Sequence, residues 1–164
     1  MTDDPINMQP LRRSRKRLRA GDLFTFQMPD ARYYYGRVVS TDACLGQVAD
    51  GLVLVYVFKD GQVTKGADRE VAQVRNLLLP PIMTNRLGWS DGYFETVDHW
   101  PLGDGEVLPR HVFKARDREQ YWDAEGRQAV PPFDVPIGRW SVASYRSIDD
   151  QVSAALGIPL APEQ

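Results

Sequence analysis

The sequence predicts a β-dominated α+β fold, in which one C-terminal helix packs on a strongly bent antiparallel sheet or on a small, partly open barrel. Three observations carry this prediction. Several segments alternate apolar and polar residues, which is the period of a half-buried strand. Clusters of glycine, proline and aspartate separate these segments at short intervals, as they do between neighbouring strands. A helical spacing of apolar residues is convincing only over residues 147–156.

The first two strands are predicted to form a hairpin. Residues 24–28 place two phenylalanines and a methionine on one face and polar side chains on the other. Residues 29–31 have the composition of a turn, and the second strand follows over residues 32–40. Gly36 inside this second strand indicates a bulge or a close approach by a neighbouring group.

The strongest apolar run, residues 52–59, has apolar side chains on both faces and therefore predicts a buried central strand. Residues 67–79 fit either a short helix or an edge strand, and both alternatives stay open. A hairpin is predicted over residues 120–130 around the turn at Glu125 and Gly126. The remaining predicted strands are residues 92–100, 111–115 and 138–143.

The predicted C-terminal helix begins at Ser147, which can cap the first turn. Asp149 and Asp150 favour its positive N-terminal end. Gly157 ends it, and Pro159 prevents its continuation. An apolar stripe is expected to dock on the sheet, and it consists of Ile148, Val152, Ala155 and Leu156.

The length of 164 residues suits one domain. We expect residues 20–158 to form it, with residues 1–19 as a flexible basic arm and residues 159–164 as a tail. No apolar run approaches the ~18–20 residues that span a bilayer, and the acidic opening at residues 2–4 is unlike a secretory signal. The single cysteine, Cys44, favours a reducing compartment. We therefore expect a cytoplasmic protein without a membrane partner.

Charge is unevenly distributed, although the net charge is only −2. Six of the 20 basic residues fall within residues 12–19, while only two of the 22 acidic residues precede position 20. The remainder of the chain therefore carries a formal charge of −6. Three interpretations of the basic segment stay open: a solvated tail, an electrostatic contact to nucleic acid, or a segment that folds back on the body or engages an acidic partner.

Common catalytic motifs do not occur in the sequence: it has no zinc-protease His-Glu-x-x-His, no Gly-x-Ser-x-Gly elbow and no phosphate-binding loop. Asp98, His99 and His111 are the candidate metal ligands if the protein is an enzyme, with Glu106 nearby in sequence. Asp98 and His99 would point to opposite faces of a strand, which disfavours their convergence. We therefore assign no catalytic residue, no metal and no cofactor.

One segment stands out as a candidate surface for a partner protein. Turn residues flank it, and it combines an aromatic side chain with cations and acids. Large aromatic residues are common anchors of protein interfaces, and they are equally common in the core of a small sheet. The candidate partner-binding residues are Arg86, Trp89, Asp91, Tyr93 and Glu95.

A series of short motifs occurs in a characteristic order along the chain: Gly21-Asp22-Leu23-Phe24, Tyr35-Gly36-Arg37-Val38, Leu54-Val55-Tyr56-Val57-Phe58, Pro80-Pro81-Ile82, Gly88-Trp89, Gly92-Tyr93-Phe94, Leu108-Pro109-Arg110-His111 and Tyr145-Arg146-Ser147-Ile148-Asp149-Asp150. Together they resemble the immunity protein 26 family of bacterial polymorphic toxin systems. That family is often named jointly with the phosphotriesterase HocA. The resemblance covers residues 18–158.

The resemblance implies two activities of different classes. An immunity protein binds a toxin domain in the cytoplasm and blocks it, whereas the second family name implies hydrolysis of organophosphate triesters. A binder requires only a complementary surface, and an acidic, aromatic-rich body suits a basic toxin such as a nuclease. Toxin neutralisation is therefore the main hypothesis. The alternatives are a phosphotriesterase-like hydrolase and a small nucleic-acid-binding module that uses residues 12–19.

Overall fold

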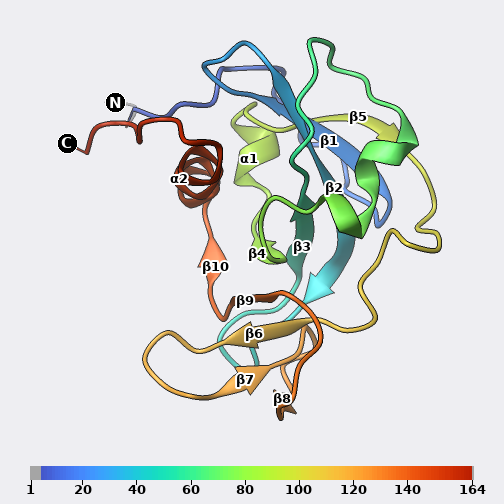
Figure 1. Ribbon diagram of the computed structural model, residues 1–164, viewed down its shortest axis with the longest axis vertical. Coiled ribbons are helices and arrows are strands. Elements are labelled where there is room, and N and C mark those ends of the chain that lie inside the picture. The colour runs from blue at the N-terminus through green and yellow to red at the C-terminus, as the bar shows by residue number, and fades with distance from the viewer. Residues whose placement is uncertain (1–4, 164) are drawn as a thin grey trace.

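The larger of two sheets forms the centre of the computed structural model, which describes residues 5–163 (Figure 1). The described part excludes residues 2–4, on which the expectation about a secretory signal partly depends. It also excludes the last residue of the predicted tail. In spatial order the strands of this sheet are β10 (Val142–Ala143), β4 (Ile82–Thr84), β3 (Leu52–Val57), β2 (Tyr33–Ala43), β1 (Asp22–Gln27) and β5 (Glu95–His99).

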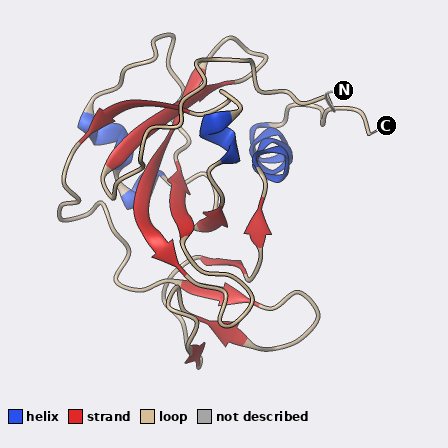
Figure 2. Cartoon of the chain, turned by 180° about the vertical axis from the view of Figure 1, so that it is seen from behind, coloured by secondary structure: helices blue, strands red, loops and turns tan. Residues whose placement is uncertain are grey.

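The smaller sheet lies at one end of the molecule's long axis (Figures 1 and 2). Its strands, in spatial order, are β8 (Gln128–Ala129), β7 (Tyr121–Trp122), β6 (Val112–Lys114) and β9 (Ile137–Arg139). The helical elements of the chain are the 3₁₀ turns η1 (Arg69–Ala72) and η2 (Val74–Asn76) and the α-helices α1 (Leu87–Ser90) and α2 (Tyr145–Leu156). No helix among residues 5–163 combines the length and apolar character needed to cross a membrane.

The β-dominated α+β class and the packed C-terminal helix are confirmed, but the predicted bent antiparallel sheet or small barrel is wrong. Both sheets are mixed, because β10 pairs in parallel with β4 and β9 pairs in parallel with β6. Parallel neighbours require a long crossover, and here the chain builds all four strands of the smaller sheet between β4 and β10. Within residues 5–163, no pairing joins the outer strands β10 and β5, so the larger sheet stays open.

The predicted hairpin is confirmed, with β1 and β2 antiparallel and Phe24 opposite Gly36. A Cβ atom on Gly36 would lie 2.2 Å from the Phe24 ring. Gly36 is therefore the site of a close approach, as the sequence indicated. The aromatic ring occupies the space in which any other residue would place its side chain.

The central strand β3 separates two hydrophobic cores, and all six of its residues are buried. Val53, Val55 and Val57 belong to the core on the face that carries α1 and α2. Leu52, Leu54 and Tyr56 point to the opposite face and belong to a core shared with η1 and β6. The two-sided apolar pattern therefore reflects a strand that is covered on both sides.

Several local predictions need correction. Residues 138–143 do not form one closing strand: they divide between β9 and β10, which belong to different sheets. Ser144, and not Ser147, caps α2, because its side chain accepts the backbone N–H of Ser147. Ala155 is exposed and lies outside the docked stripe, whereas Ile148 and Val152 are fully buried. Residues 67–79 contain the 3₁₀ turns η1 and η2, followed by an isolated bridge between Leu77 and Phe58.

The N-terminal segment folds back along the face of the larger sheet that carries α1 and α2. Met8 and Leu18 are 2% and 5% exposed and belong to the core on that face. These contacts place Met8 and Leu18 against the body, in agreement with the fold-back interpretation of the basic segment. The division of the chain into an arm, a domain and a tail otherwise stays a prediction.

Candidate partner-binding surface

Residues 11–14 are fixed by their backbone to the α1–β5 region. The N–H of Leu11 donates to the carbonyl of Gly92 at 2.7 Å, and the N–H of Ser14 donates to the carbonyl of Trp89 at 3.0 Å. The N–H of Arg12 donates to Glu95 Oε1 at 3.2 Å. The basic segment and the candidate segment around Trp89, which the sequence treated separately, therefore form one continuous surface.

This surface, called the basic surface below, carries seven exposed cations: Arg12, Arg13, Arg15, Lys16, Arg17, Arg19 and Arg86. Arg19 lies 3.6 Å from Asp22. Among the described residues, no carboxylate lies within ion-pairing distance of the other six cations. Their charges are therefore directed to solvent without internal compensation.

The carboxylates of this region serve internal contacts. Asp22 is 2% exposed, and it accepts the N–H of Arg19 at 2.9 Å and bonds His99 Nδ1 at 2.8 Å. Glu95 accepts Lys65 Nζ at 3.0 Å in addition to the N–H of Arg12. Asp91 accepts the hydroxyl of Tyr145 at 2.9 Å. With seven cations against three carboxylates, the region is electropositive.

The five candidate partner-binding residues lie together but differ in exposure. Arg86 and Asp91 are exposed, and Glu95 is half-buried. Tyr93 is also half-buried, and its ring stacks on Tyr145 with the centroids 4.9 Å apart. Trp89 is only 2% exposed, so it supports this surface from beneath and follows the core interpretation of the aromatic residues.

The structure does not bring the three candidate metal ligands together. His99 Nδ1 is bonded to Asp22, and Asp98 Oδ1 accepts the N–H of His99. His111 Nε2 lies 2.6 Å from the Tyr56 hydroxyl. Within residues 5–163, no group of three or more His, Cys, Asp and Glu side chains is placed to hold a metal ion.

His111 is held as a neutral acceptor. The Tyr56 hydroxyl accepts the N–H of Leu108 at 3.0 Å, so its proton is available for donation to His111 Nε2. Burial lowers the pKa of His111 below its usual value and raises the pKa of Tyr56 to about 12. Both shifts favour the neutral pair, which fixes the 108–111 segment to β3.

A buried charge cluster was missed by the sequence reasoning. Arg37 is fully buried in β2, and its Nε and Nη2 atoms donate to the carbonyls of Gly21 and Trp100 at 2.8 and 2.6 Å. Arg37 Nη1 lies 3.6 Å from Glu106 Oε2, and Arg69 forms two hydrogen bonds to the same carboxylate at 2.8 and 2.7 Å. The signal in the sequence was a lone arginine inside an apolar strand.

This cluster is a structural link and not a reactive site. Hydrogen bonds from Arg69 are the main cause that lowers the pKa of Glu106 to about 2, and the N–H of Gly103 and the charge of Arg37 add to it. Because the carboxylate is ionised and its partners are fixed, the cluster joins the 100–106 connection to the β1–β2 hairpin. Arg37 also lies within one of the motifs that carry the family resemblance.

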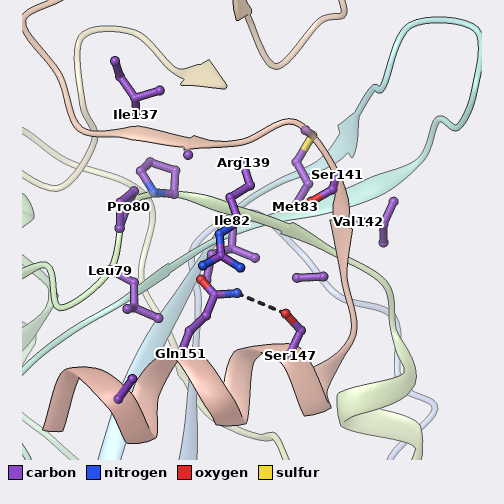
Figure 3. Close-up of a pocket in the computed structure, with 14 residues that line it drawn as sticks. Leu79, Pro80, Ile82, Met83, Ile137, Arg139, Ser141, Val142, Ser147 and Gln151 are labelled. Atoms are coloured by element: carbon purple, nitrogen blue, oxygen red, sulfur yellow. Dashed lines mark hydrogen bonds between the residues drawn. The ribbon is translucent and has the colours of Figure 1, made fainter. Parts of the chain in front are cut away.

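A hollow of about 300 Å³ lies between α2, β4 and β9 (Figure 3). Its lining is mainly apolar and includes Leu79, Ile82 and Val142, and Gln151 Nε2 donates to Ser147 Oγ at 3.2 Å on its α2 side. Arg139 is its one charged lining residue. The hollow therefore differs in chemistry from the basic surface.

Comparison with known proteins gives one match. A family model described as Immunity protein 26 matches residues 19–122, which include every strand from β1 to β7. No curated protein and no solved structure matches the chain. The hollow beside α2 is lined largely by residues 137–154, which follow the matched part, whereas most of the basic surface lies at the start of the matched part and before it.

Proposed function

The chain belongs to the immunity protein 26 family, and from this we propose that it neutralises a cognate bacterial toxin in the cytoplasm by binding it in a stoichiometric complex. The family match over residues 19–122, more than half of the chain, is the observation that carries this proposal. A neutralising protein of this kind acts by covering a surface of the toxin, so complementarity of shape and charge is its main chemical requirement.

The described geometry is consistent with a preformed binder. The central strands are covered on both faces, and hydrogen bonds fix the N-terminal segment along the sheet. Binding to a surface that is already ordered avoids the entropic cost of ordering loops and side chains. We therefore expect the chain to bind with little change in its backbone.

Four of the sequence-predicted residues, Arg86, Asp91, Tyr93 and Glu95, are proposed as contacts to the toxin, with Trp89 supporting them from the core. Their surroundings alter the expected chemistry of the partner. The remainder of the chain has a formal charge of −6, which suggested a basic toxin, yet these residues lie beside seven exposed cations. The local charge and the overall charge of the body therefore have opposite signs.

The phosphotriesterase alternative receives no support from the described residues. Asp98 accepts the N–H of His99, and His99 Nδ1 is hydrogen-bonded to Asp22. His111 is hydrogen-bonded to the hydroxyl of Tyr56. We therefore do not propose hydrolysis as a second function.

Titration of the toxin encoded beside this chain's gene tests the proposal. The purified chain is added to the toxin in increasing molar ratio, and toxin activity and complex mass are measured. A stoichiometric binder abolishes activity near one equivalent and forms a complex of defined mass. Undiminished toxin activity without a complex would contradict the proposal, and complete neutralisation far below one equivalent would indicate a catalyst instead.

A further inference from the structure

We propose that the basic surface docks on an acidic face of the toxin, and this inference rests on the function proposed above. Its strongest support is the number of uncompensated cations. Six of the seven cations lack a carboxylate partner among the described residues. Several exposed cations elsewhere lie in ion pairs, such as Arg110 with Asp134 at 3.3 Å and Arg127 with Asp123 at 3.0 Å.

The positive electrostatic potential of such a surface favours a partner face of negative charge. Like charges that face each other across an interface weaken binding, whereas opposite charges steer the encounter and fix the register. Seven cations within one region would repel the basic toxin that the overall charge suggested. The partner face that fits here carries several Asp and Glu side chains.

The second support is that the cations stand on a fixed backbone. Upstream of the surface, the N–H of Met8 donates to Asp149 at 2.8 Å and that of Gln9 donates to the carbonyl of Gln27 at 2.9 Å. Near its other end, Leu18 is buried and the N–H of Arg19 donates to Asp22. Because the backbone is already ordered, the conformational entropy lost on binding is mainly that of the side chains.

A protein partner is favoured over single-stranded nucleic acid. Proteins that bind single strands combine cations with aromatic rings on which bases stack. The tryptophan beside these cations, Trp89, is 2% exposed and packs against Phe24 and Phe94, so a base cannot reach its ring. The most strongly stacking ring type in this region is therefore buried, and the other aromatic side chain among the candidate residues, Tyr93, already stacks on Tyr145.

Charge reversal with a matched control tests the inference. The test variant is Arg15→Glu/Lys16→Glu/Arg17→Glu. The control, Arg116→Glu/Arg118→Glu/Arg139→Glu, makes the same change in net charge at three exposed arginines that belong to β9 and the β6–β7 connection. Unchanged denaturation midpoints establish that both variants fold. The probes are the toxin domain with its catalytic residue inactivated and a single-stranded RNA of about 16 nucleotides.

We expect the test variant to bind the toxin at least about 10-fold more weakly, mainly through a lower association rate, while the control stays within about 2-fold of wild type. The wild-type association rate should also fall more steeply with salt than that of the test variant. Equal toxin affinity of the test variant and wild type would overturn the inference and leave the proposed function intact.

Three further results would also overturn it. Equal weakening by both variants would show an effect of net charge and not of this surface. If the basic surface binds the RNA tightly while toxin affinity is insensitive to the reversal, its partner is nucleic acid. A wild-type chain that does not bind the toxin would overturn the proposed function itself, and this inference with it.

Discussion

The carboxylate of Asp149 accepts the backbone N–H of Met8 at 2.8 Å, across 141 positions of the chain. Its second oxygen accepts the N–H of Asn7 at 3.0 Å. Asp149 is fully buried in α2, so the helix holds the start of the N-terminal segment by two charge-assisted hydrogen bonds. The position of the basic surface therefore depends on a helix far from it in sequence.

Replacement of Asp149 by Asn is expected to release this end of the segment. Asn retains one acceptor and places an amide donor against the other backbone N–H, so we expect a loss of about 1–3 kcal/mol in the free energy of unfolding. Burial raises the pKa of Asp149, so relief of its desolvation offsets part of this loss. Urea denaturation measures the stability, and tryptic cleavage within residues 12–19 should accelerate.

The adjacent Asp150→Asn variant is the control, because Asp150 is exposed on the same helix. Its free energy of unfolding should stay within about 0.5 kcal/mol of the wild-type value, and trypsin should cleave it at the wild-type rate. Equal proteolysis of the two variants would mean that Asp149 does not fix the segment.

Glu106→Gln is expected to be the most damaging of these substitutions. It removes the main compensating charge of the fully buried Arg37 guanidinium and leaves only the weaker contribution of Asp22, and removing one partner of a buried pair costs about 3–5 kcal/mol. The exposed Glu119→Gln variant is the control and should keep the wild-type denaturation midpoint. Chemical denaturation at neutral pH distinguishes them.

The same carboxylate makes stability sensitive to acid. The pKa of Glu106 is lowered from 4.5 to about 2, so its contribution is fully present above pH 4.5 and is lost as the pH falls toward 2. Unfolding free energies measured across this range should fall more steeply for wild type than for Glu106→Gln. Parallel profiles would show that Glu106 is not the group responsible.

His111 affects stability in a different pH window. Because burial lowers its pKa below 6.5, protonation is more costly in the folded than in the unfolded chain. Its contribution is present above pH 6.5 and declines as the pH falls below that value. His111→Gln keeps an acceptor for the Tyr56 hydroxyl and should flatten the stability profile between about pH 7.5 and 5. A His99→Gln variant is the control, in which the decline caused by His111 should persist.

Gly36→Ala tests the close approach within the hairpin. The added methyl group would lie 2.2 Å from the Phe24 ring, so the ring must move and the core repack, at a cost of about 1–3 kcal/mol. Gly66→Ala is the control, because a Cβ at Gly66 meets no atom within 4 Å. Thermal denaturation of both variants measures the difference, and equal midpoints would contradict the role given to Gly36.

Prediction from the sequence succeeded where a local pattern determines the structure. The alternation around Phe24 specified the hairpin, the two-sided run of β3 specified burial on both faces, and Gly157, with φ +72°, ends α2 as expected. It failed where pairing joins distant segments. Residues 138–143 read as one strand, but tertiary contacts divide them between two sheets.

For the candidate surface, too, the sequence predicted local features but not the contacts between distant segments. The residue types around Trp89 and the charge of residues 12–19 were visible in the sequence, and so was the family resemblance. The sequence did not show that these two segments form one surface, because their contact depends on hydrogen bonds such as that from the N–H of Ser14 to the carbonyl of Trp89. The burial of Trp89 was left open as well, since an aromatic residue fits a core and an interface equally well.

The sequence by itself determined the β-rich class, the order of most strands, the terminal helix and the family, because these follow from side-chain periodicity, turn residues and short motifs. Only the tertiary structure decided that the sheets are open and mixed, that Arg37 and Glu106 lie buried together, and that the basic segment is fixed over Trp89. The physical reason is that periodicity identifies which face of an element is buried, but not which distant segment covers it.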